Sequence, residues 1–183
     1  MILQYEKMKK KLLVLAIIFL LTVISFSGCT SSVDKSSAKS LNLTLKDLPT
    51  GYIECNHDDS NKDLFVLTKP RESYRIVFFL GDCTNWSQGV DSIIAIFNST
   101  DESIDFFEFS TNIFRGSEVK EAKNILGDES YGIEIENANN TIGFALCFRI
   151  SKIVTVVSYL YADYSFAFNL SKIVEQRIYD NMK

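Results

Sequence analysis

Histidine is nearly absent from this chain, with His57 the single example among 183 residues. Acid–base catalysis uses histidine more often than any other side chain, and catalytic zinc sites commonly depend on it. The four cysteines form no C-x-x-C pair, and the sequence has no G-x-S-x-G, no phosphate-binding P-loop and no H-E-x-x-H. The sequence therefore predicts no catalytic residue, no metal centre and no cofactor, and we expect the protein not to be an enzyme.

Basic charge is also scarce. Lys and Arg number 19 against 23 Asp and Glu, which gives a formal net charge of −4 and an isoelectric point near 5.1. Nucleic-acid-binding domains normally carry a basic face, so we expect no nucleic-acid partner. Only 2 Pro and 8 Gly occur, which excludes a collagen-like or low-complexity chain, while 14 Phe and 8 Tyr are enough for a packed core.

The first 28 residues have the pattern of an export signal. Lys7 and the run Lys9–Lys11 precede fifteen residues, Leu12–Phe26, that are apolar except for two. At about 1.5 Å per residue this run spans roughly 22 Å as a helix, which is shorter than the ~30 Å hydrocarbon core of a bilayer. We therefore expect residues 1–28 to be a signal peptide, and the alternative is an uncleaved membrane anchor over residues 12–28.

Ser27-Gly28-Cys29 closes this segment and resembles a prokaryotic lipobox, in which the cysteine thiol is lipidated and becomes the mature N-terminus. The resemblance implies a lipid on Cys29 that attaches the protein to the cell membrane, with its domain facing the cell exterior. Plain secretion without a lipid is the third alternative. Residues 29–42 are rich in Ser and Lys, so we expect them to form a flexible tether. We expect residues 43–183 to form a single extracytoplasmic domain.

Two further features fit an exported domain. Candidate glycan acceptors of the form Asn-X-Ser/Thr lie at Asn42, Asn85, Asn98 and Asn139. Three cysteines remain once Cys29 is assigned to the lipid. Cys55 and Cys83 border loops, whereas Cys147 lies within an apolar run, so the sequence favours a disulfide between Cys55 and Cys83. The alternative is that all three are reduced.

The hydrophobic pattern predicts alternating groups of strands and helices. Strands are predicted at residues 52–55, 64–68, 74–80, 91–98, 131–137, 142–150 and 153–161, the last three as an antiparallel meander. Ser99 and Glu102 match a capping box and predict a helix over residues 100–114, with a strand at 104–109 as the alternative. Apolar residues at helical spacing predict a second helix over residues 165–181. The predicted class is α+β, an antiparallel sheet with about two helices packed on one face.

Short motifs in this layout resemble a group of small extracytoplasmic lipoprotein domains of bacteria and archaea. The segments that carry the resemblance are Asp47–Tyr52 (DLPTGY), Leu126–Ser130 (LGDES), Gly143-Phe144, Phe148-Arg149 and Lys172–Glu175 (KIVE), within residues 43–181. The resemblance implies the fold and the outward location. The group has no assigned activity, so the resemblance implies no catalytic residue.

A polar loop contains the weak candidates for a cation site. Asp59, Asn61 and Asp63 have the alternating oxygen ligands that begin a calcium-binding loop. Such a loop needs Gly at its sixth position and Glu at its twelfth, where this chain has Leu64 and Pro70. An EF-hand is therefore excluded, and a solvated polar turn is the favoured interpretation.

The candidate contact loop contains the single tryptophan, Trp86, between Gly81 and Gly89. An exposed Trp is a typical anchor for a protein partner, although it can also fold back over the sheet. We expect a non-catalytic binding or structural module at the cell surface, with a surface protein as its partner. The alternatives are an accessory subunit of a membrane complex and an extracytoplasmic hydrolase, which would need His57 or carboxylates such as Asp58, Asp128 and Glu129 to converge.

Overall fold

The computed structural model describes residues 36–58, 69–84, 88–113, 118–119, 123–137, 140–161 and 164–183. Every described residue belongs to one compact unit, which lies within Lys35–Lys183. The predicted signal peptide and Cys29 thus lie outside the described residues. Among the described helices, none is long and apolar enough to cross a membrane.

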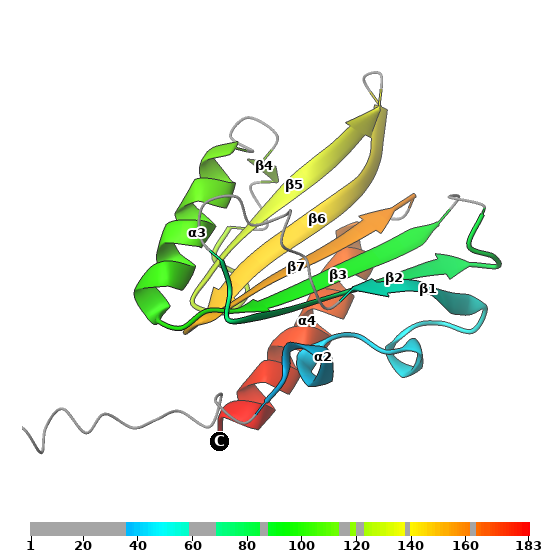
Figure 1. Cartoon of the computed structure of the whole chain (residues 1–183). Helices are drawn as coiled ribbons and strands as arrows, with labels where there is room; N and C mark the ends of the chain where they lie inside the picture. The colour runs from blue at the N-terminus through cyan, green and yellow to red at the C-terminus, as the bar shows by residue number, and fades with distance from the viewer. Residues whose placement is uncertain are drawn as a thin grey trace, which may run out of the picture. The chain divides into compact units, whose positions relative to one another are not determined.

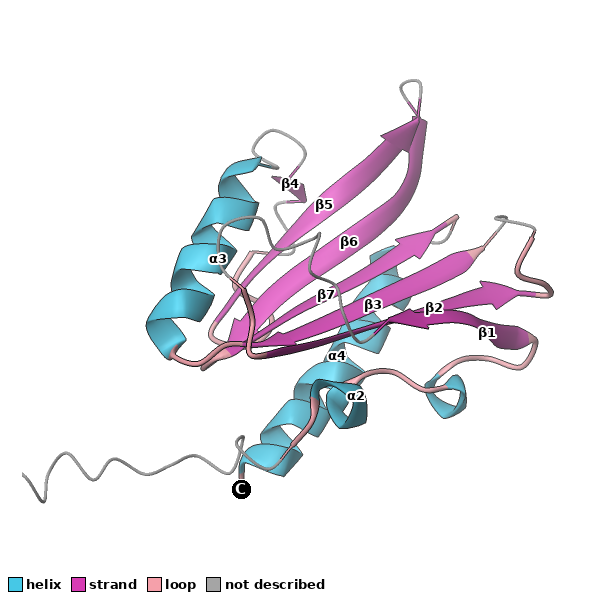
Figure 2. Cartoon of the chain, viewed as in Figure 1, coloured by secondary structure: helices cyan, strands magenta, loops and turns pink. Residues whose placement is uncertain are grey.

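One antiparallel sheet forms the centre of the domain (Figures 1 and 2). Its described strands are β1 (Tyr52–Asp58), β2 (Glu72–Leu80), β3 (Gly89–Ile96), β4 (Glu118–Val119), β5 (Glu129–Asn137), β6 (Asn140–Ile150) and β7 (Ile153–Leu160). Their order in the sheet is β1-β2-β3-β7-β6-β5-β4. Two meanders therefore meet where β3 pairs with β7, and the predicted α+β class with an antiparallel sheet is confirmed.

The two long helices, α3 (Thr100–Ile113) and α4 (Tyr164–Met182), lie on opposite faces of the sheet rather than together on one (Figure 1). Phe107 of α3 contacts Tyr131, which is paired with Cys147 of β6. Tyr164 of α4 contacts Phe144, which also belongs to β6 but points to the face opposite Cys147. Successive strand residues point to opposite faces, and β6 is apolar at both sets of positions, so each face needs a cover.

The start of α3 follows the capping box that the sequence predicts. The Glu102 N–H donates to Ser99 Oγ at 3.2 Å, and the Asn98 N–H donates to Glu102 Oε2 at 3.0 Å. The first bond satisfies an N–H group that a helix leaves without a partner at its first turn, and the second ties Glu102 to the residue before the cap. The helix interpretation of residues 104–109 is therefore right, and the strand alternative is not.

The folded domain begins earlier than the sequence predicts. The short helix α2 (Ala38–Leu41) falls within the predicted tether, yet Ala38 and Leu41 are 0% and 1% exposed. The Ala38 N–H donates to Glu72 Oε1 at 2.7 Å, which fixes α2 to β2. The tether prediction for residues 29–42 is thus corrected at its C-terminal end, because two apolar side chains in a Ser-rich segment are enough to dock it. A 3₁₀ turn, η2 (Leu45–Asp47), follows and leads into β1.

Asp128 and Glu129 have a structural role at the start of β5. Arg149, whose side chain is 7% exposed, donates to Asp128 Oδ2 at 3.1 Å and to Glu129 Oε1 at 2.8 Å. Asp128 also accepts the Ser151 N–H at 2.7 Å, so it holds the β6–β7 turn as well. Both carboxylates are therefore engaged in neutralising a buried guanidinium rather than opposed as an acid–base pair.

Candidate functional site

Strand register places a cross-strand row of side chains on the face that α3 covers. Arg75, Ile93, Val156, Cys147 and Tyr131 are partners across β2, β3, β7, β6 and β5. Partners directly opposite each other point to the same face of a sheet. The next row, two residues further along, consists of Val77, Asp91, Ser158, Ala145 and Ile133. These two rows form the floor of the candidate site.

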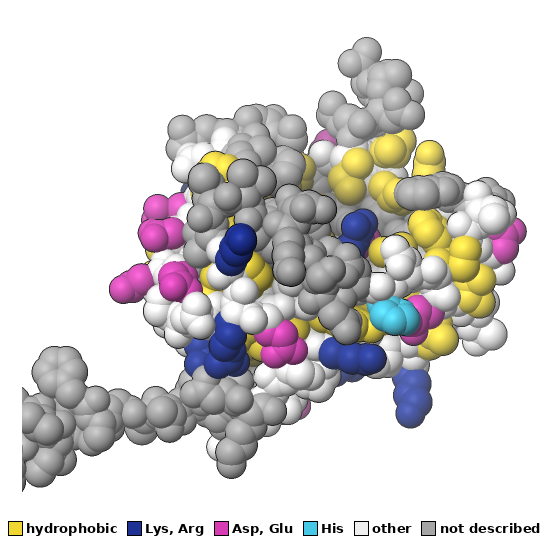
Figure 3. Space-filling view, viewed as in Figure 1, with side chains coloured by type: hydrophobic (Ala, Val, Ile, Leu, Met, Phe, Trp, Pro, Cys, Tyr) yellow, Lys and Arg dark blue, Asp and Glu magenta, His cyan; other side chains and the backbone are white. Residues whose placement is uncertain are grey.

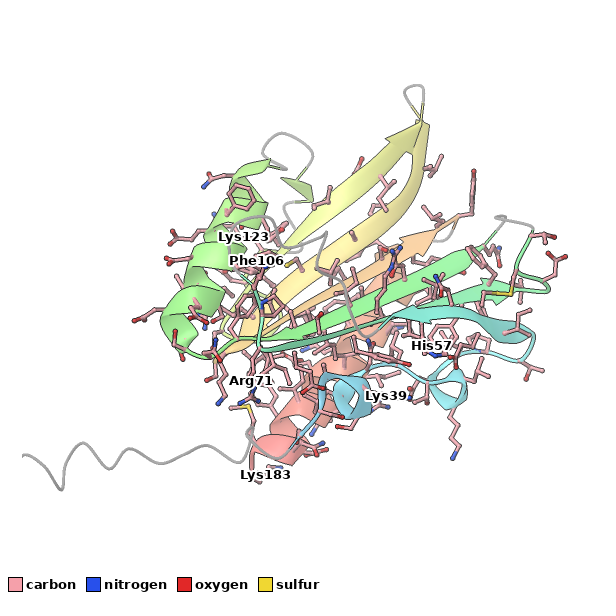
Figure 4. The ribbon with its side chains drawn as sticks, viewed as in Figure 1. Lys39, His57, Arg71, Phe106, Lys123 and Lys183 are labelled. Carbon is pink, nitrogen blue, oxygen red and sulfur yellow. A yellow bond between two sulfur atoms is a disulfide. The ribbon has the colours of Figure 1, made fainter. Side chains whose placement is uncertain are left out.

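An apolar cavity of about 400 Å³ lies above the β5–β7 part of this floor. Its walls include Ile93, Ala145 and Val156 from the sheet and Phe106 and Phe109 from α3. Phe106 lies between α3 and the sheet in Figure 4. The volume falls in the range of preformed small-molecule sites, which are mostly apolar with a few placed polar groups.

A second cavity, of about 410 Å³, lies above the β2–β3 part of the same face. It contains the charged pair Arg75 and Asp91, together with Asn56 and the apolar side chain of Leu160. Ser158 lines both cavities, so they meet at the β7 strand. We call the two together the sheet trough, and its defining residues are Ile93, Ala145, Val156, Ser158, Arg75 and Asp91. Figure 3 views the molecule from this side and shows hydrophobic side chains at the surface beside charged ones.

The polar end of the trough is a bidentate ion pair. Arg75 Nε donates to Asp91 Oδ1 at 3.0 Å, and Arg75 Nη2 donates to Asp91 Oδ2 at 2.6 Å. The two side chains are 37% and 26% exposed, so the pair is open to the trough rather than sealed within the core. The pair gives this end of the trough both hydrogen-bond donors and hydrogen-bond acceptors.

The titratable groups at the apolar end are held in their neutral forms. Burial raises the pKa of the Cys147 thiol to about 12, and burial also raises the pKa of Tyr131. A thiol is nucleophilic only as the thiolate, so Cys147 is a poor nucleophile near neutral pH. Cys147 is the free cysteine of the described region, and it is buried.

A disulfide joins Cys55 to Cys83 at the rim of the polar cavity, with an S–S distance of 2.06 Å. This is the pairing that the sequence favours. Register along the β1–β2 pair shifts between Glu54 and Asn56, so Cys55 is the extra residue of a bulge. The bond therefore ties edge strand β1 to the β2–β3 connection beside Arg75 and Asp91.

Several predicted site residues fall outside the part of the chain that the structure describes. They are Cys29, Asp59, Asn61, Asp63, Asn85, Trp86 and Asn139. Within the described residues there is no group of three or more His, Cys, Asp or Glu that could hold a metal ion. Asn98 is exposed just before α3, so its glycosylation stays a prediction.

Asn42 is corrected as a glycan acceptor, because its side chain is 0% exposed. Asn42 Nδ2 donates to the Tyr74 carbonyl at 3.0 Å and to the Ser92 carbonyl at 3.2 Å. Its Oδ1 accepts from Ser92 Oγ at 2.6 Å. The amide nitrogen that would carry a glycan is therefore used to join β2 and β3 beneath α2, and the acceptor pattern alone does not reveal this burial.

The structure does not bring the predicted acid–base candidates together. His57 on β1 lies 3.0 Å from Glu54 Oε1 through its Nδ1, near one edge of the sheet (Figure 4). Asp128 and Glu129 are bound to Arg149 at the start of β5, and β2, β3, β7 and β6 separate the two strands. A hydrolytic site made from both groups is therefore not formed by the described residues.

The residues of the trough were not singled out from the sequence, although two signals for them exist. Arg75 interrupts the apolar run Tyr74–Leu80, and Asp91 interrupts the run that ends at Phe97. A charged residue within such a strand needs a partner. The sequence shows neither that the two strands are neighbours nor that these positions are in register, and the pair is visible only in the sheet.

Comparison with solved structures shows what the fold of this chain is similar to. No family model matches the chain, and no curated protein matches it. The extracellular domain of PknH from Mycobacterium tuberculosis matches with a TM-score of 0.55 and 11% sequence identity, over 78% of this chain and 95% of that one. The chain shares that domain's fold. At this identity the likeness extends to the fold alone.

Proposed function

We propose that this protein is a membrane-anchored, extracytoplasmic binding module whose ligand site is the sheet trough. The observation that carries the proposal is the pair of cavities, about 400 and 410 Å³, that meet at Ser158 on one face of the sheet. The outward location is supported by the export pattern of residues 1–28, by the disulfide, and by a fold shared with an extracellular domain.

The module binds its ligand without chemical change. The titratable groups of the apolar end are neutral, and Arg75 and Asp91 at the polar end are bonded to each other. His57 lines a different cavity of about 330 Å³ with Lys39, Glu54 and Tyr74. A preformed site with these properties favours recognition over catalysis.

The membrane attachment is proposed through a lipid on Cys29. Mass spectrometry of the protein isolated from membranes tests this, because a lipidated chain lacks residues 1–28 and carries acyl groups on its first residue. A chain that keeps residues 12–28 would show an uncleaved anchor instead. An unmodified N-terminus after cleavage would show plain secretion.

The binding site is tested by filling the trough where its two cavities meet. The full chain in lipid nanodiscs is irradiated with a photoreactive alkyl diazirine that has no polar head, and labelled peptides are mapped by mass spectrometry. We expect labelling of the tryptic peptide Ile153–Lys172, which contains β7, and an at least tenfold loss of this labelling in Ser158→Phe. Mapping by peptide separates the trough from the hydrophobic N-terminal segment.

The matched control is Gln176→Phe, which adds the same phenyl group on the exposed side of α4 and leaves the trough unchanged. Thermal unfolding of each variant shows whether it is folded. Ala145→Phe is a second variant that fills the apolar cavity with a phenyl group, this time from β6. Equal β7 labelling in the wild type and in both folded filled variants would refute a ligand site in the trough.

A further inference from the structure

We infer that the ligand of the sheet trough carries one flexible hydrocarbon chain, of which about ten to fourteen carbons lie in the apolar cavity. This inference rests on the proposed function and names the chemical class of its ligand. It depends on the apolar cavity alone, whose described lining residues include no Asp, Glu, Lys, Arg or His. The chain is the part of the ligand that this cavity recognises.

The polar side chains of the cavity already have partners within the protein. Ser110 Oγ donates to a carbonyl of α3 at 2.9 Å, and Ser158 Oγ donates to a carbonyl of β3 at 3.4 Å. Tyr131 and Cys147 are hydrogen-bonded to each other, and burial raises the pKa of both, so neither is charged near neutral pH. A polar ligand group placed here would lose its water without gaining equivalent bonds, whereas a methylene group gains by leaving water.

The strands beneath the cavity set the length of the chain. The floor crosses β3, β7, β6 and β5 in one register, at Ile93, Val156, Cys147 and Tyr131. Three strand spacings of about 4.8 Å make a distance of roughly 14 Å. Carbon–carbon bonds of about 1.5 Å at a near-tetrahedral angle advance an extended chain by about 1.3 Å each, so this distance takes about eleven carbons.

The volume of the cavity limits the ligand to a single chain. A methylene group takes about as much space as a water molecule, roughly 30 Å³, so a cavity of about 400 Å³ holds about thirteen carbons. The length and the volume thus give nearly the same number of carbons. This agreement leaves no room for a second chain beside the first, or for a fused-ring molecule, which is wider than one chain.

A series of headless alkyl diazirines, from hexyl to octadecyl, tests the length of the chain. The full chain in lipid nanodiscs is irradiated with each probe, and labelling of the tryptic peptide Ile153–Lys172 is measured with the signal from Ser158→Phe subtracted. The result is divided by the labelling of the nanodisc lipid, which reports how much of that probe the membrane holds. Differences in membrane partition between short and long probes are thereby removed.

Normalised labelling should be highest for chains near dodecyl. Octadecyl should label at least tenfold less, because each methylene that projects from the cavity into water lowers the occupancy by about fourfold relative to the membrane. Hexyl should also label less than dodecyl, because a short chain leaves part of the cavity lining without contacts.

Variants of the cavity lining should move the preferred length in opposite directions. Ile135→Ala removes three carbons from the β5 end and should shift the preference toward probes that are about two or three carbons longer. Ala145→Leu adds three carbons on β6 and should shift it toward shorter probes by a similar amount. Ile53→Ala makes the same truncation at an exposed position of β1 and is the matched control, so it should leave the preferred length unchanged. Thermal unfolding shows whether each variant is folded.

Two forms of the same chain distinguish the sources of the ligand. A phosphatidylcholine with a photoreactive dodecanoyl tail represents a membrane lipid, and the headless dodecyl probe represents a free apolar molecule. Labelling of Ile153–Lys172 by either form, with loss of that labelling in Ser158→Phe, supports a hydrocarbon chain in the cavity.

The inference is overturned if normalised labelling is equal for all lengths or rises steadily to octadecyl, or if folded Ile135→Ala keeps the wild-type length preference. Equal labelling by a photoreactive sterol would overturn it as well. In each of these cases the loss of labelling in Ser158→Phe would still support the trough as a binding site. If no probe labels the wild type above Ser158→Phe and Ala145→Phe, the proposed function fails together with the inference.

Discussion

Breaking the disulfide between Cys55 and Cys83 should destabilise the domain by an amount that follows from its position in the chain. The two cysteines are 28 residues apart, and closure of a loop of that length lowers the entropy of the unfolded chain. The chain-entropy relation gives about 3.6 kcal/mol at 25 °C for this separation. In a domain of this size that corresponds to a fall in melting temperature on the order of 10 °C.

The structural consequence should be concentrated at β1. Among the described strands, β1 is at the edge of the sheet and pairs with β2 alone. The disulfide and a hydrogen bond between the Tyr52 and Tyr159 hydroxyls at 2.6 Å also hold it. Without the cross-link, β1 should open more often than the central strands. Hydrogen exchange should show the largest loss of protection in residues 52–58, with β6 and β7 less affected.

The assay is thermal unfolding of the full chain with and without a phosphine reductant, for the wild type, Cys55→Ser, Cys83→Ser and the double variant. Each variant removes the same bond, so all three should melt at the same lowered temperature, and reductant should bring the wild type close to them. The double variant with reductant is the control and should not change. A wild type whose melting temperature is insensitive to reduction, or a double variant much less stable than either single one, would refute the reasoning.

Three further predictions concern residues outside the trough. Asn42→Ala should lower the free energy of unfolding, measured by urea titration, by about 2–3 kcal/mol, because it leaves buried polar groups of β2 and β3 without their partner. A decrease below about 0.5 kcal/mol would contradict this. The double variant Asp128→Asn/Glu129→Gln should lower the free energy of unfolding by about 3–5 kcal/mol, because it leaves the buried Arg149 cation without its carboxylates. Arg149→Met should lower it by less, because the carboxylates that it leaves are 45% and 41% exposed. The reverse order of the two losses would show the argument to be wrong. The contribution of Cys147 to stability should be constant below about pH 9 and fall between about pH 9 and 12, because Cys147 keeps its proton in the folded state after the unfolded thiol has lost it. The same urea titration across this range should show a smaller fall for Cys147→Ala, and an equal fall would exclude the thiol as a main cause.

Local patterns predicted most elements of the fold. The capping box at Ser99 and the apolar spacing after residue 164 place α3 and α4 within a residue or two of their observed bounds. Both signals depend on neighbours within a few positions, so they do not require knowledge of the tertiary structure. The meander of β5, β6 and β7 was predicted for the same reason, since short turns join adjacent antiparallel strands.

Position in the fold was harder to predict than element type. Asn42 belongs to a sequence pattern typical of exposed acceptors, but its burial depends on β2 and β3, whose partner residues lie 32 and 50 positions away. The sides on which α3 and α4 pack depend on the path of the chain around the sheet. Because β6 is apolar on both faces, its pattern permits the two helices to pack on one face of the sheet or on opposite faces. The sequence pattern therefore did not decide between these two arrangements.

The amino-acid sequence by itself determined the export pattern, the α+β class, the scarcity of catalytic groups and the favoured cysteine pair, because each depends on composition or on short spacings. The tertiary structure decided what the exported domain offers to a ligand. Arg75 and Asp91 meet because β2 and β3 are paired in one register, and β7 lies beside β3 although they are far apart in the chain. The trough thus arises from long-range strand order, which brings an ion pair and an apolar cavity to one face of the sheet.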